Sequence, residues 1–342
     1  MRTTIENIAR EADVSTATVD RVLNNRRGVG ARTKASVLSV AERMGFFEGR
    51  ESEFQETRQS LPKLKLDFIL PTAKNQFMDV LRNEIETQSS VRHNLQVRVT
   101  GVDGITARQF AEQVRALEGL SDGIGLVALD HPEVREAIRV VSARGTKVVT
   151  LASDISHVPR VAYIGIDNRA AGRLAGYLMH RFYSGTGSGK VALFSGSLSY
   201  RGHEEREMGF RHILTEESTA LHIVEQREMM DDPDQAFEFT LEVLAGHPDL
   251  SAIYNVGAGN SGIAKALKAK TLDQHVLLIG HDATEDTRQL LLDGTIDALI
   301  DQNPRVEARE ALNALEAAIS GKYFEKHAPR LQVIFRENIP EI

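Results

Sequence analysis

Three glycines late in the chain have the spacing of a dinucleotide-binding loop. Gly257, Gly259 and Gly262 lie in "YNVGAGNSG", directly after an apolar run and directly before a helix-like run. In a G-x-G-x-x-G loop, the backbone N–H groups approach a pyrophosphate at the start of a helix. Asp282 is placed like the acid that binds the ribose in such sites. This motif keeps an NAD-dependent enzyme open as an alternative, although the spacing also arises by chance.

Other motifs for catalysis or metal binding are incomplete. "SGTGSGKV" has Ser184 and Val191 where a P-loop needs Gly and then Ser or Thr. "HEERE" has Glu207 where a zinc-binding helix needs its second histidine. The chain has no cysteine, its 11 histidines show no ligand spacing, and it contains no G-x-S-x-G elbow. We therefore expect no catalytic residue, no cofactor and no metal, and a protein that is not an enzyme.

Polar and aromatic side chains follow several apolar runs that have the length of buried strands. Asn75 and Phe77 follow "LKLDFIL", Asp154 follows "KVVTL", and Asn168 follows "AYIGI". Carboxylates and amides hydrogen-bond to adjacent hydroxyl groups, and an aromatic ring packs on the apolar face of a sugar. These positions predict contacts to a polyhydroxylated ligand. Helix capping is the alternative at each Asp and Asn.

The first 46 residues have the pattern of three short helices. Ile5, Ile8 and Ala9 recur at helical spacing, and Asp13 and Ser15 supply turn and capping chemistry before "TATVDRVLN". A third apolar stripe follows "NNRRGVG". Such a helix-turn-helix domain places its second helix in the major groove of DNA. We expect its shared core to contain Ala9, Val14, Val19 and Val22.

The outer face of the second predicted helix carries side chains that read DNA. Arg21 suits guanine or a phosphate, Thr16 a base edge or a phosphate, and Ala17 a thymine methyl group. The first fifty residues hold nine Lys and Arg against six Asp and Glu, a net charge of +3 within a chain of net charge -7. A small basic unit on an acidic body favours double-stranded DNA as its partner.

The segment "TIENIAREADVSTATVDRVLNNRRGVGARTKASVLSVAERMGF" resembles the headpiece of the LacI/GalR family of bacterial transcription regulators. The family's "VS-x-x-TV-x-RVLN" core runs from Val14 to Asn24. The resemblance implies a DNA-binding headpiece over residues 1–46, whose DNA contacts are Thr4, Ser15, Thr16, Ala17, Thr18, Arg21, Asn24 and Arg32.

Two departures from the family pattern bear on DNA binding. Asp20 stands where the family commonly has Ser, and phosphates repel a carboxylate unless it pairs with Arg21 or accepts from a cytosine amine. Residues 47–63 lack the Pro-Asn and the Ala/Leu pair of a minor-groove hinge helix, and Phe54 is their bulky apolar candidate for a wedge. We treat residues 47–63 as a hinge or linker.

From Leu64 onward, apolar runs of strand length alternate with amphipathic helical stretches. Eleven such runs are too many for one comfortable sheet, and the alternation is typical of right-handed β-α-β units. The predicted fold class is α/β, with a three-helix helix-turn-helix headpiece followed by two doubly wound parallel-sheet lobes. Ligands of such sheets bind beyond the carboxyl ends of the strands, here in a cleft between the lobes.

Residues 64–338 resemble the periplasmic-binding-protein-like (type I) sensor domain of the same regulators and of sugar-binding proteins. The resemblance implies an N-lobe of about residues 64–165 and 304–328, and a C-lobe of about 166–302 and 330–342. It adds Arg206 before Gly209 and Phe210, Asp282 in a Gly-x-Asp motif, and Gln302 near the last crossover. It also makes "GAGNSG" a modified ligand loop beside Asn255. The expected effector contacts are Asn75, Phe77, Asp154, Arg206, Asn255, Asp282 and Gln302.

These features together predict a ligand-responsive transcription regulator. We expect a repressor that binds operator DNA as a homodimer, with a tetramer as the alternative, and that senses a small sugar, polyol or sugar phosphate. The sequence shows no secretory signal and no long apolar run, so we expect a cytoplasmic protein without a membrane partner. A sugar-binding transport receptor is the alternative outside gene regulation.

Overall fold

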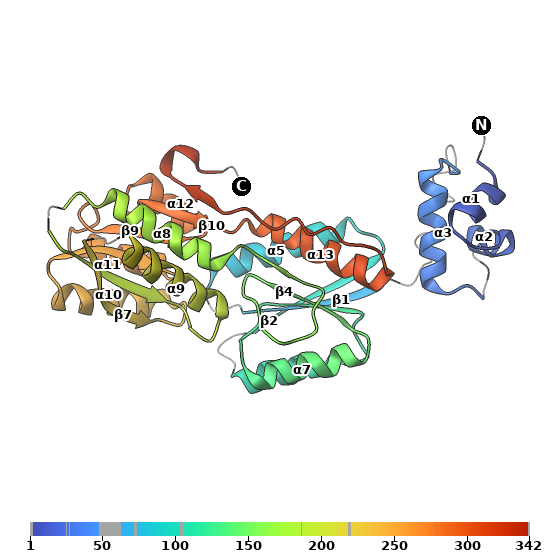
Figure 1. The fold of residues 1–342 in the computed structure, drawn as a ribbon, viewed down its shortest axis with the longest axis horizontal. Helices are drawn as coiled ribbons and strands as arrows, with labels where there is room; N and C mark the ends of the chain where they lie inside the picture. Colours follow the sequence, from blue (N-terminus) through green and yellow to red (C-terminus); the bar gives the residue numbers. More distant parts are fainter. Residues whose placement is uncertain are drawn as a thin grey trace. The chain divides into compact units, whose positions relative to one another are not determined.

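The computed structural model describes residues 3–24, 26, 28–47, 63–71, 74–102, 106–185, 187–217 and 220–340 of the chain. Within these ranges, no helix has both the length and the apolar composition that a membrane crossing requires. The predicted α/β fold with an N-terminal helix-turn-helix headpiece is confirmed (Figure 1). The predicted hinge, residues 47–63, falls almost entirely outside the described residues, and so does its wedge candidate Phe54.

The headpiece consists of α1 (Ile5–Glu11), α2 (Thr16–Leu23) and α3 (Ala31–Arg43). Thr4 caps α1, and Ser15 caps α2 by accepting a hydrogen bond from the Thr18 N–H at 3.1 Å. Asp13 has a φ of 51°, which gives the tight turn between α1 and α2. The buried core is formed by Ile8, Ala9, Val19, Val22, Val37, Leu38, Val40 and Ala41, with Val14 packed at its edge.

The first lobe of the remaining chain is built on five strands in the order β2-β1-β3-β4-β5. They are β1 (Leu64–Pro71), β2 (Leu95–Val102), β3 (Gly123–Leu126), β4 (Lys147–Leu151) and β5 (Ala162–Ile164). The helices of this lobe are α5 (Gln76–Ser90), α6 (Ala107–Arg115), α7 (Pro132–Ala143) and α13 (Pro304–Ser320). Apolar residues of α6 and α7 pack with those of the sheet into one core, and α13 contacts β3, β4 and β5.

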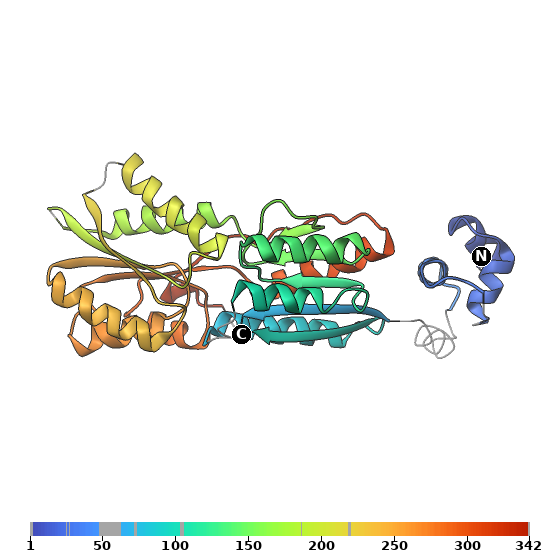
Figure 2. The same ribbon diagram turned by 90° about the horizontal axis from the view of Figure 1, so that it is seen from below.

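The second lobe has six strands in the order β11-β10-β9-β8-β6-β7. They are β6 (Gly189–Ser195), β7 (Leu221–Glu228), β8 (Leu250–Asn255), β9 (Leu277–His281), β10 (Ala298–Asp301) and β11 (Gln332–Ile334). Its helices are α8 (Asn168–Phe182), α9 (Arg201–Glu216), α10 (Pro233–Gly246), α11 (Asn260–Ala269) and α12 (Glu285–Leu292), with a 3-10 turn at Arg336–Asn338. Figure 2 shows helices on both faces of the sheets. Two apolar clusters therefore fill this lobe, one on each face of its sheet.

The chain passes between the lobes three times, after β5, after β10 and after α13. At the second passage Asn303 adopts a left-handed conformation with a φ of 59° and caps α13 by accepting from the Val306 N–H at 3.2 Å. After the third passage, β11 pairs antiparallel with β10, whereas the sequence predicted parallel strands. An antiparallel edge strand on a parallel sheet is common, since an edge strand need not arrive through a β-α-β crossover.

Candidate functional site

The exposed face of α2 brings together the residues predicted to read DNA bases. Thr16, Ala17 and Arg21 are exposed, while Val19 and Val22 on the opposite side are buried. Arg21 has no hydrogen-bond or ion-pair partner among the described residues, so its guanidinium is available to a duplex. This exposure follows from the helical period, because an amphipathic helix buries one stripe and leaves the other side to solvent.

The other predicted DNA contacts are more varied. Thr4 and Ser15 are exposed but serve as helix caps, and the Thr18 hydroxyl lies 2.8 Å from that of Ser15. The Asn24 amide donates to the Asp20 carboxylate at 2.8 Å. Arg32 lies in the first turn of α3, and its side chain is outside the described part of the structure. Capping residues at helix N-termini still hold hydroxyl groups where phosphates bind.

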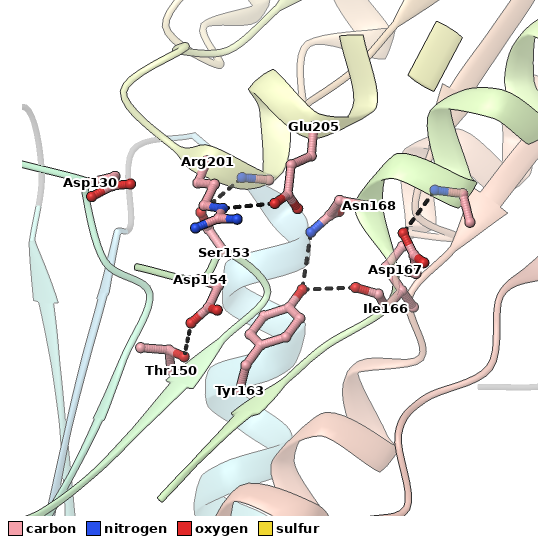
Figure 3. Close-up of polar contacts among 12 residues, drawn as sticks. Asp130, Thr150, Ser153, Asp154, Tyr163, Ile166, Asp167, Asn168, Arg201 and Glu205 are labelled. Carbon is pink, nitrogen blue, oxygen red and sulfur yellow. Dashed lines mark hydrogen bonds and ion pairs between the residues drawn. The ribbon is translucent and has the colours of Figure 1, made fainter. Parts of the chain in front are cut away.

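Arg206 is the best-buried cation of the two lobes. Its side chain comes from α9 and is 3% exposed. The Nε group donates to Asn168 Oδ1 at 2.7 Å, and Nη1 donates to the Val256 carbonyl at 2.9 Å. Asn168 in turn donates to Tyr163 Oη at 3.0 Å, as Figure 3 shows. Asn168 therefore positions Arg206.

Close packing of two helices places Arg206. A methyl group added to Gly172 of α8 would lie 1.8 Å from the Arg206 carbonyl oxygen, and one added to Gly209 of α9 would lie 2.1 Å from the Arg169 carbonyl oxygen. Phe210 stacks on Tyr254 of β8 with ring centroids 4.6 Å apart. The Arg-x-x-Gly-Phe pattern thus has a physical meaning, because Gly209 permits the close approach and Phe210 fixes the rotation of α9.

Asp282 and Gln302 meet at the carboxyl ends of β9 and β10. The Gln302 amide donates to both carboxylate oxygens of Asp282, at 3.0 and 3.1 Å. Asp282 has a φ of 67°, an uncommon backbone conformation for a residue other than glycine. Burial raises the pKa of Asp282 to about 7, and the nearby Arg206 guanidinium opposes this rise. Gln302 Oε1 is buried without a partner in the described structure, so it is an acceptor available to a ligand hydroxyl.

Residues of the first lobe meet the second lobe at Asn75. Its amide donates to Asp231 Oδ2 at 3.1 Å, and its Oδ1 accepts from the Phe77 N–H at 3.1 Å. Asp231 Oδ1 accepts from the Ala258 N–H at 2.9 Å. Lys74 forms exposed ion pairs with Asp232 at 3.2 Å and Asp234 at 2.8 Å. These contacts hold the two sides of the cleft against one another.

Three adjoining cavities are lined by Asn75, beside these contacts between the lobes. The central cavity has a volume of about 40 Å³ and is lined by Asn75, Phe77, Arg206, Asp282 and Gln302, among others. A cavity of about 300 Å³ shares Asn75, Phe77 and Asp282 with it, and one of about 460 Å³ shares Asn75, Tyr200 and Asp231. The central cavity has room for a few waters, whereas its neighbours have volumes typical of small-molecule sites.

Two predicted effector contacts are placed elsewhere. Asp154 accepts from the Thr150 hydroxyl at 2.7 Å (Figure 3). It also accepts from Arg160 at 2.6 Å and lines none of the three cavities. The preceding Ser153 lines the central cavity instead and accepts from the Gly202 N–H at 3.1 Å. Asn255 is fully buried, and its amide donates to Asn260 Oδ1 at 2.8 Å, so it stabilises the loop and lines none of these three cavities.

The glycine motif has a packing explanation. Gly259 has a φ of 92°, and a methyl group at Gly262 would lie 1.9 Å from the Pro233 carbonyl oxygen of α10. A methyl group at Gly257 would lie 2.5 Å from Asp231 Oδ1. The three glycines therefore allow α11 to begin close to α10 and allow Asp231 to reach the loop. This packing accounts for the spacing that the sequence offered as a dinucleotide motif.

Three cleft residues escaped the sequence analysis. Asp231, Tyr200 and His203 line the central cavity. Burial lowers the pKa of His203 and raises that of Tyr200 above its usual value, so both side chains are neutral near pH 7. Asp231 comes five residues after the predicted strand "LHIVEQ", and its place after a strand was the available signal.

Deeper in the molecule, two titratable groups are held neutral. His281 is buried, and its Nε2 lies 2.9 Å from Tyr254 Oη. Burial lowers the pKa of His281 well below its usual range. Glu307 in the first turn of α13 is fully buried, and neither of its carboxyl oxygens has a partner in the described structure. Burial raises the pKa of Glu307 well above its usual range.

Comparison with known proteins identifies both parts of the chain. Residues 66–323 match the family model described as "Periplasmic binding protein domain", which spans most of the chain. The chain belongs to this family. Residues 4–47 match the model described as "Bacterial regulatory proteins, lacI family". With both matches, this lacI-family chain is a ligand-responsive transcriptional regulator, and the matched families are those of regulators and binding proteins rather than of enzymes.

Individual relatives of this lacI-family protein are distant. The ribose import binding protein RbsB of Bacillus subtilis (strain 168) is 23% identical over 258 residues, covering 75% of this chain and 81% of that protein. The HTH-type transcriptional repressor PurR of Vibrio vulnificus is 25% identical over 223 residues, covering 64% of this chain and 63% of that protein. A solved solute binding protein from Burkholderia graminis, in complex with D-arabinose, has a TM-score of 0.74 at 23% identity and covers 82% of this chain and 98% of its own. This structure shares the fold.

Proposed function

We propose that this protein represses a carbohydrate or polyol utilisation operon. Its affinity for the operator changes when a small sugar, polyol or sugar phosphate binds between its lobes. The observation that carries the proposal is the meeting of Arg206, Asp282 and Gln302 at one cavity, in a chain that also exposes Arg21 on its recognition helix. The first set suits a polyhydroxylated effector, and the second suits a DNA base edge.

The cavity walls support a sugar-like effector. The guanidinium of Arg206, the carboxylate of Asp282 and the free Oε1 of Gln302 offer donors and acceptors to neighbouring hydroxyl groups. Phe77 offers an apolar ring face to the same cavity. Relatives named for ribose and D-arabinose binding share this fold, which agrees with an effector of that class.

The headpiece supports operator binding by a homodimer. One headpiece offers few base-contacting side chains, since Thr16, Ala17 and Arg21 form the exposed face of α2. Two headpieces related by a two-fold axis would read the two halves of a near-palindromic operator. We propose the remaining predicted DNA residues, Thr4, Ser15, Thr18, Asn24 and Arg32, as phosphate or sugar contacts. Because the operator lies on the chromosome, the proposal places the protein in the cytoplasm.

Coupling between effector and operator would act through the cleft contacts. An effector in the central cavity must displace the direct contact of Asn75 with Asp231 or enlarge the space between them. Either change alters the arrangement of the two lobes, and such coupling between sites is typically worth about 1–3 kcal/mol. The effector would thereby shift operator affinity by roughly 5- to 150-fold.

The test combines DNA and effector binding by the full-length protein. A duplex is selected from a random pool by the wild-type chain, and its affinity is measured against an unrelated duplex of equal length over a range of salt. We expect sequence-specific, salt-sensitive binding. A thermal-shift panel of pentoses, hexoses, polyols and their phosphates should contain a compound that raises Tm and changes operator affinity. If no duplex is enriched, DNA recognition is refuted; if no compound shifts Tm, the effector class is refuted.

A further inference from the structure

The acid on the recognition helix has its own cation. Asp20 lies on α2, one residue before Arg21, and its Oδ2 accepts from Arg26 Nη1 at 3.0 Å. Its Oδ1 accepts from the Asn24 amide at 2.8 Å. The sequence left two partners open for this carboxylate, namely Arg21 or a cytosine amine. Both oxygens are instead engaged by residues at and just beyond the end of α2.

Arg26 is held beside α2 by two independent contacts. Its backbone N–H donates to the Arg21 carbonyl at 2.7 Å, and its side chain donates to Asp20. The Arg26 side chain is 65% exposed, and Asp20 is its sole hydrogen-bond partner among the described residues. A guanidinium has five N–H donors, so most of its donors remain available to an oxyanion.

Stability alone gives little reason for this pair. The Asp20 side chain is 40% exposed, and exposed ion pairs contribute little because water and salt screen them. An acid on a DNA-facing helix also repels phosphates. Pairing with Arg26 offsets part of this repulsion, because the guanidinium neutralises part of the Asp20 charge. The pairing also restricts the guanidinium to one place beside the helix. Restricting a long side chain before binding reduces the entropy lost on binding.

We propose that Asp20 is a positioning residue that holds Arg26 as a phosphate-contacting side chain at the carboxyl-terminal end of the recognition helix. The inference rests on the proposed DNA-binding function. It assigns a DNA contact to Arg26, and it turns Asp20 from an unfavourable charge into a support for that contact. The Asn24 amide donates to the carbonyl and the carboxylate of Asp20, so Asn24 helps to hold this carboxylate in place.

The test uses four variants of the full-length chain: Asp20→Ala, Arg26→Ala, the double variant, and Glu11→Ala. Glu11 is a matched control, since it is an exposed acid of the same headpiece that pairs with Arg43 at 3.1 Å, and its removal changes the net charge by the same amount. Affinity is measured for the duplex selected by the wild-type chain, over a range of salt, and circular dichroism checks that the headpiece remains helical.

We expect Arg26→Ala to lower operator affinity about tenfold, as for one lost charged hydrogen bond, and to reduce the slope of log K against log salt by about one per headpiece. Asp20→Ala should lower affinity in the same direction, and the double variant should bind like Arg26→Ala alone, because the two residues act as a unit. Glu11→Ala should bind at least as tightly as wild type, since it only removes a negative charge.

Two outcomes separate the inference from the function on which it rests. If Asp20→Ala binds as tightly as Glu11→Ala, or if the two single effects simply add, Asp20 does not position Arg26 and the inference is wrong while operator binding stands. If the wild-type chain enriches no duplex, the DNA-binding proposal and this inference are both refuted.

Discussion

The recognition helix and the interlobe cavity hold their functional side chains in opposite states. On α2, Arg21 is exposed and has no partner among the described residues. In the cavity, Arg206 is 3% exposed and already donates to Asn168 and to the Val256 carbonyl. A DNA duplex brings its own dense charge and geometry, so the reader needs only an accessible donor. A small polyhydroxylated effector makes far fewer contacts than a duplex, so an ordered site reduces the entropy lost on binding.

The largest effect is expected when the buried, ordered Arg206 side chain is removed from the cavity. Arg206→Ala leaves the Asn168 oxygen and the Val256 carbonyl without their donor and removes the cation beside Asp282. Truncation of a buried, hydrogen-bonded charge typically costs about 2 kcal/mol or more in binding, roughly thirtyfold in affinity. Calorimetric titration with the effector found by thermal shift measures this loss.

Arg211→Ala is the matched control for Arg206→Ala. Arg211 lies on the same helix, is half-exposed and pairs with Glu207 at 2.8 Å, and it lines none of the three cavities. We expect effector affinity to survive this change. Equal losses in both variants would mean that α9 as a whole, rather than the Arg206 side chain, governs binding.

The next largest effect is expected when the exposed Arg21 side chain is removed from α2. Arg21→Ala should lower affinity for the selected duplex by about 1–3 kcal/mol, while affinity for an unrelated duplex falls much less. Tm and effector affinity should remain at the wild-type values, because the Arg21 side chain is exposed and has no hydrogen-bond or ion-pair partner among the described residues. Arg10→Ala removes an exposed arginine from α1 and serves as the control for charge alone. Similar loss of discrimination in both variants would contradict base reading by Arg21.

A third, smaller effect concerns the titration of the cavity. Burial raises the pKa of Asp282 to about 7 from its usual value near 3.8, so the folded state binds a proton that the unfolded state has lost between these pH values. Stability therefore falls as pH rises through this window. Asp282→Asn removes the titration, so the difference in Tm between wild type and variant should change between about pH 5 and about pH 7. A constant difference in Tm across this window would show that Asp282 titrates normally.

The smallest effect is expected at the cleft rim. Lys74→Ala removes exposed ion pairs to Asp232 and Asp234 across the lobes, and Lys190→Ala removes one to Asp249 within the second lobe. Neither change should shift Tm measurably, because exposed ion pairs are screened by water. Of the two lysines, Lys74 pairs across the lobes and Lys190 does not, so we expect only Lys74→Ala to change effector affinity slightly. A large fall in Tm for Lys74→Ala would mean that rim charges stabilise the lobes.

Much of this architecture could be predicted from the sequence. Strand-length apolar runs and helical stripes located both sheets and the three headpiece helices, because a buried core imposes these periods. The family pattern also located Arg206, Asp282 and Gln302, which the structure brings to one cavity. The antiparallel pairing of β11 was beyond this reasoning, since a short apolar run has no direction in its composition.

The misplaced and missed cavity residues have a common physical cause. Neighbouring residues after a strand point in different directions, so Ser153 reaches the central cavity while the adjacent Asp154 turns to Thr150 and Arg160. Asp231 reaches its position through successive left-handed residues, with a φ of 51° at Met230 and 56° at Asp231. Composition and periodicity carry no information on such backbone turns, so strand-end residues could be nominated but not oriented.

The close contact of α8 with α9 at Gly172 and Gly209 limits which cavity residues can be substituted when ligand preference changes during evolution. Any side chain at Gly172 or Gly209 would collide with the backbone of the facing helix, so these helices move as one piece and carry the guanidinium of Arg206 with them. New effector preferences must then arise at other walls, such as Tyr200 or Ser153. The close helix contact thus keeps the position of Arg206 constant, while the other side chains of the cavity can change.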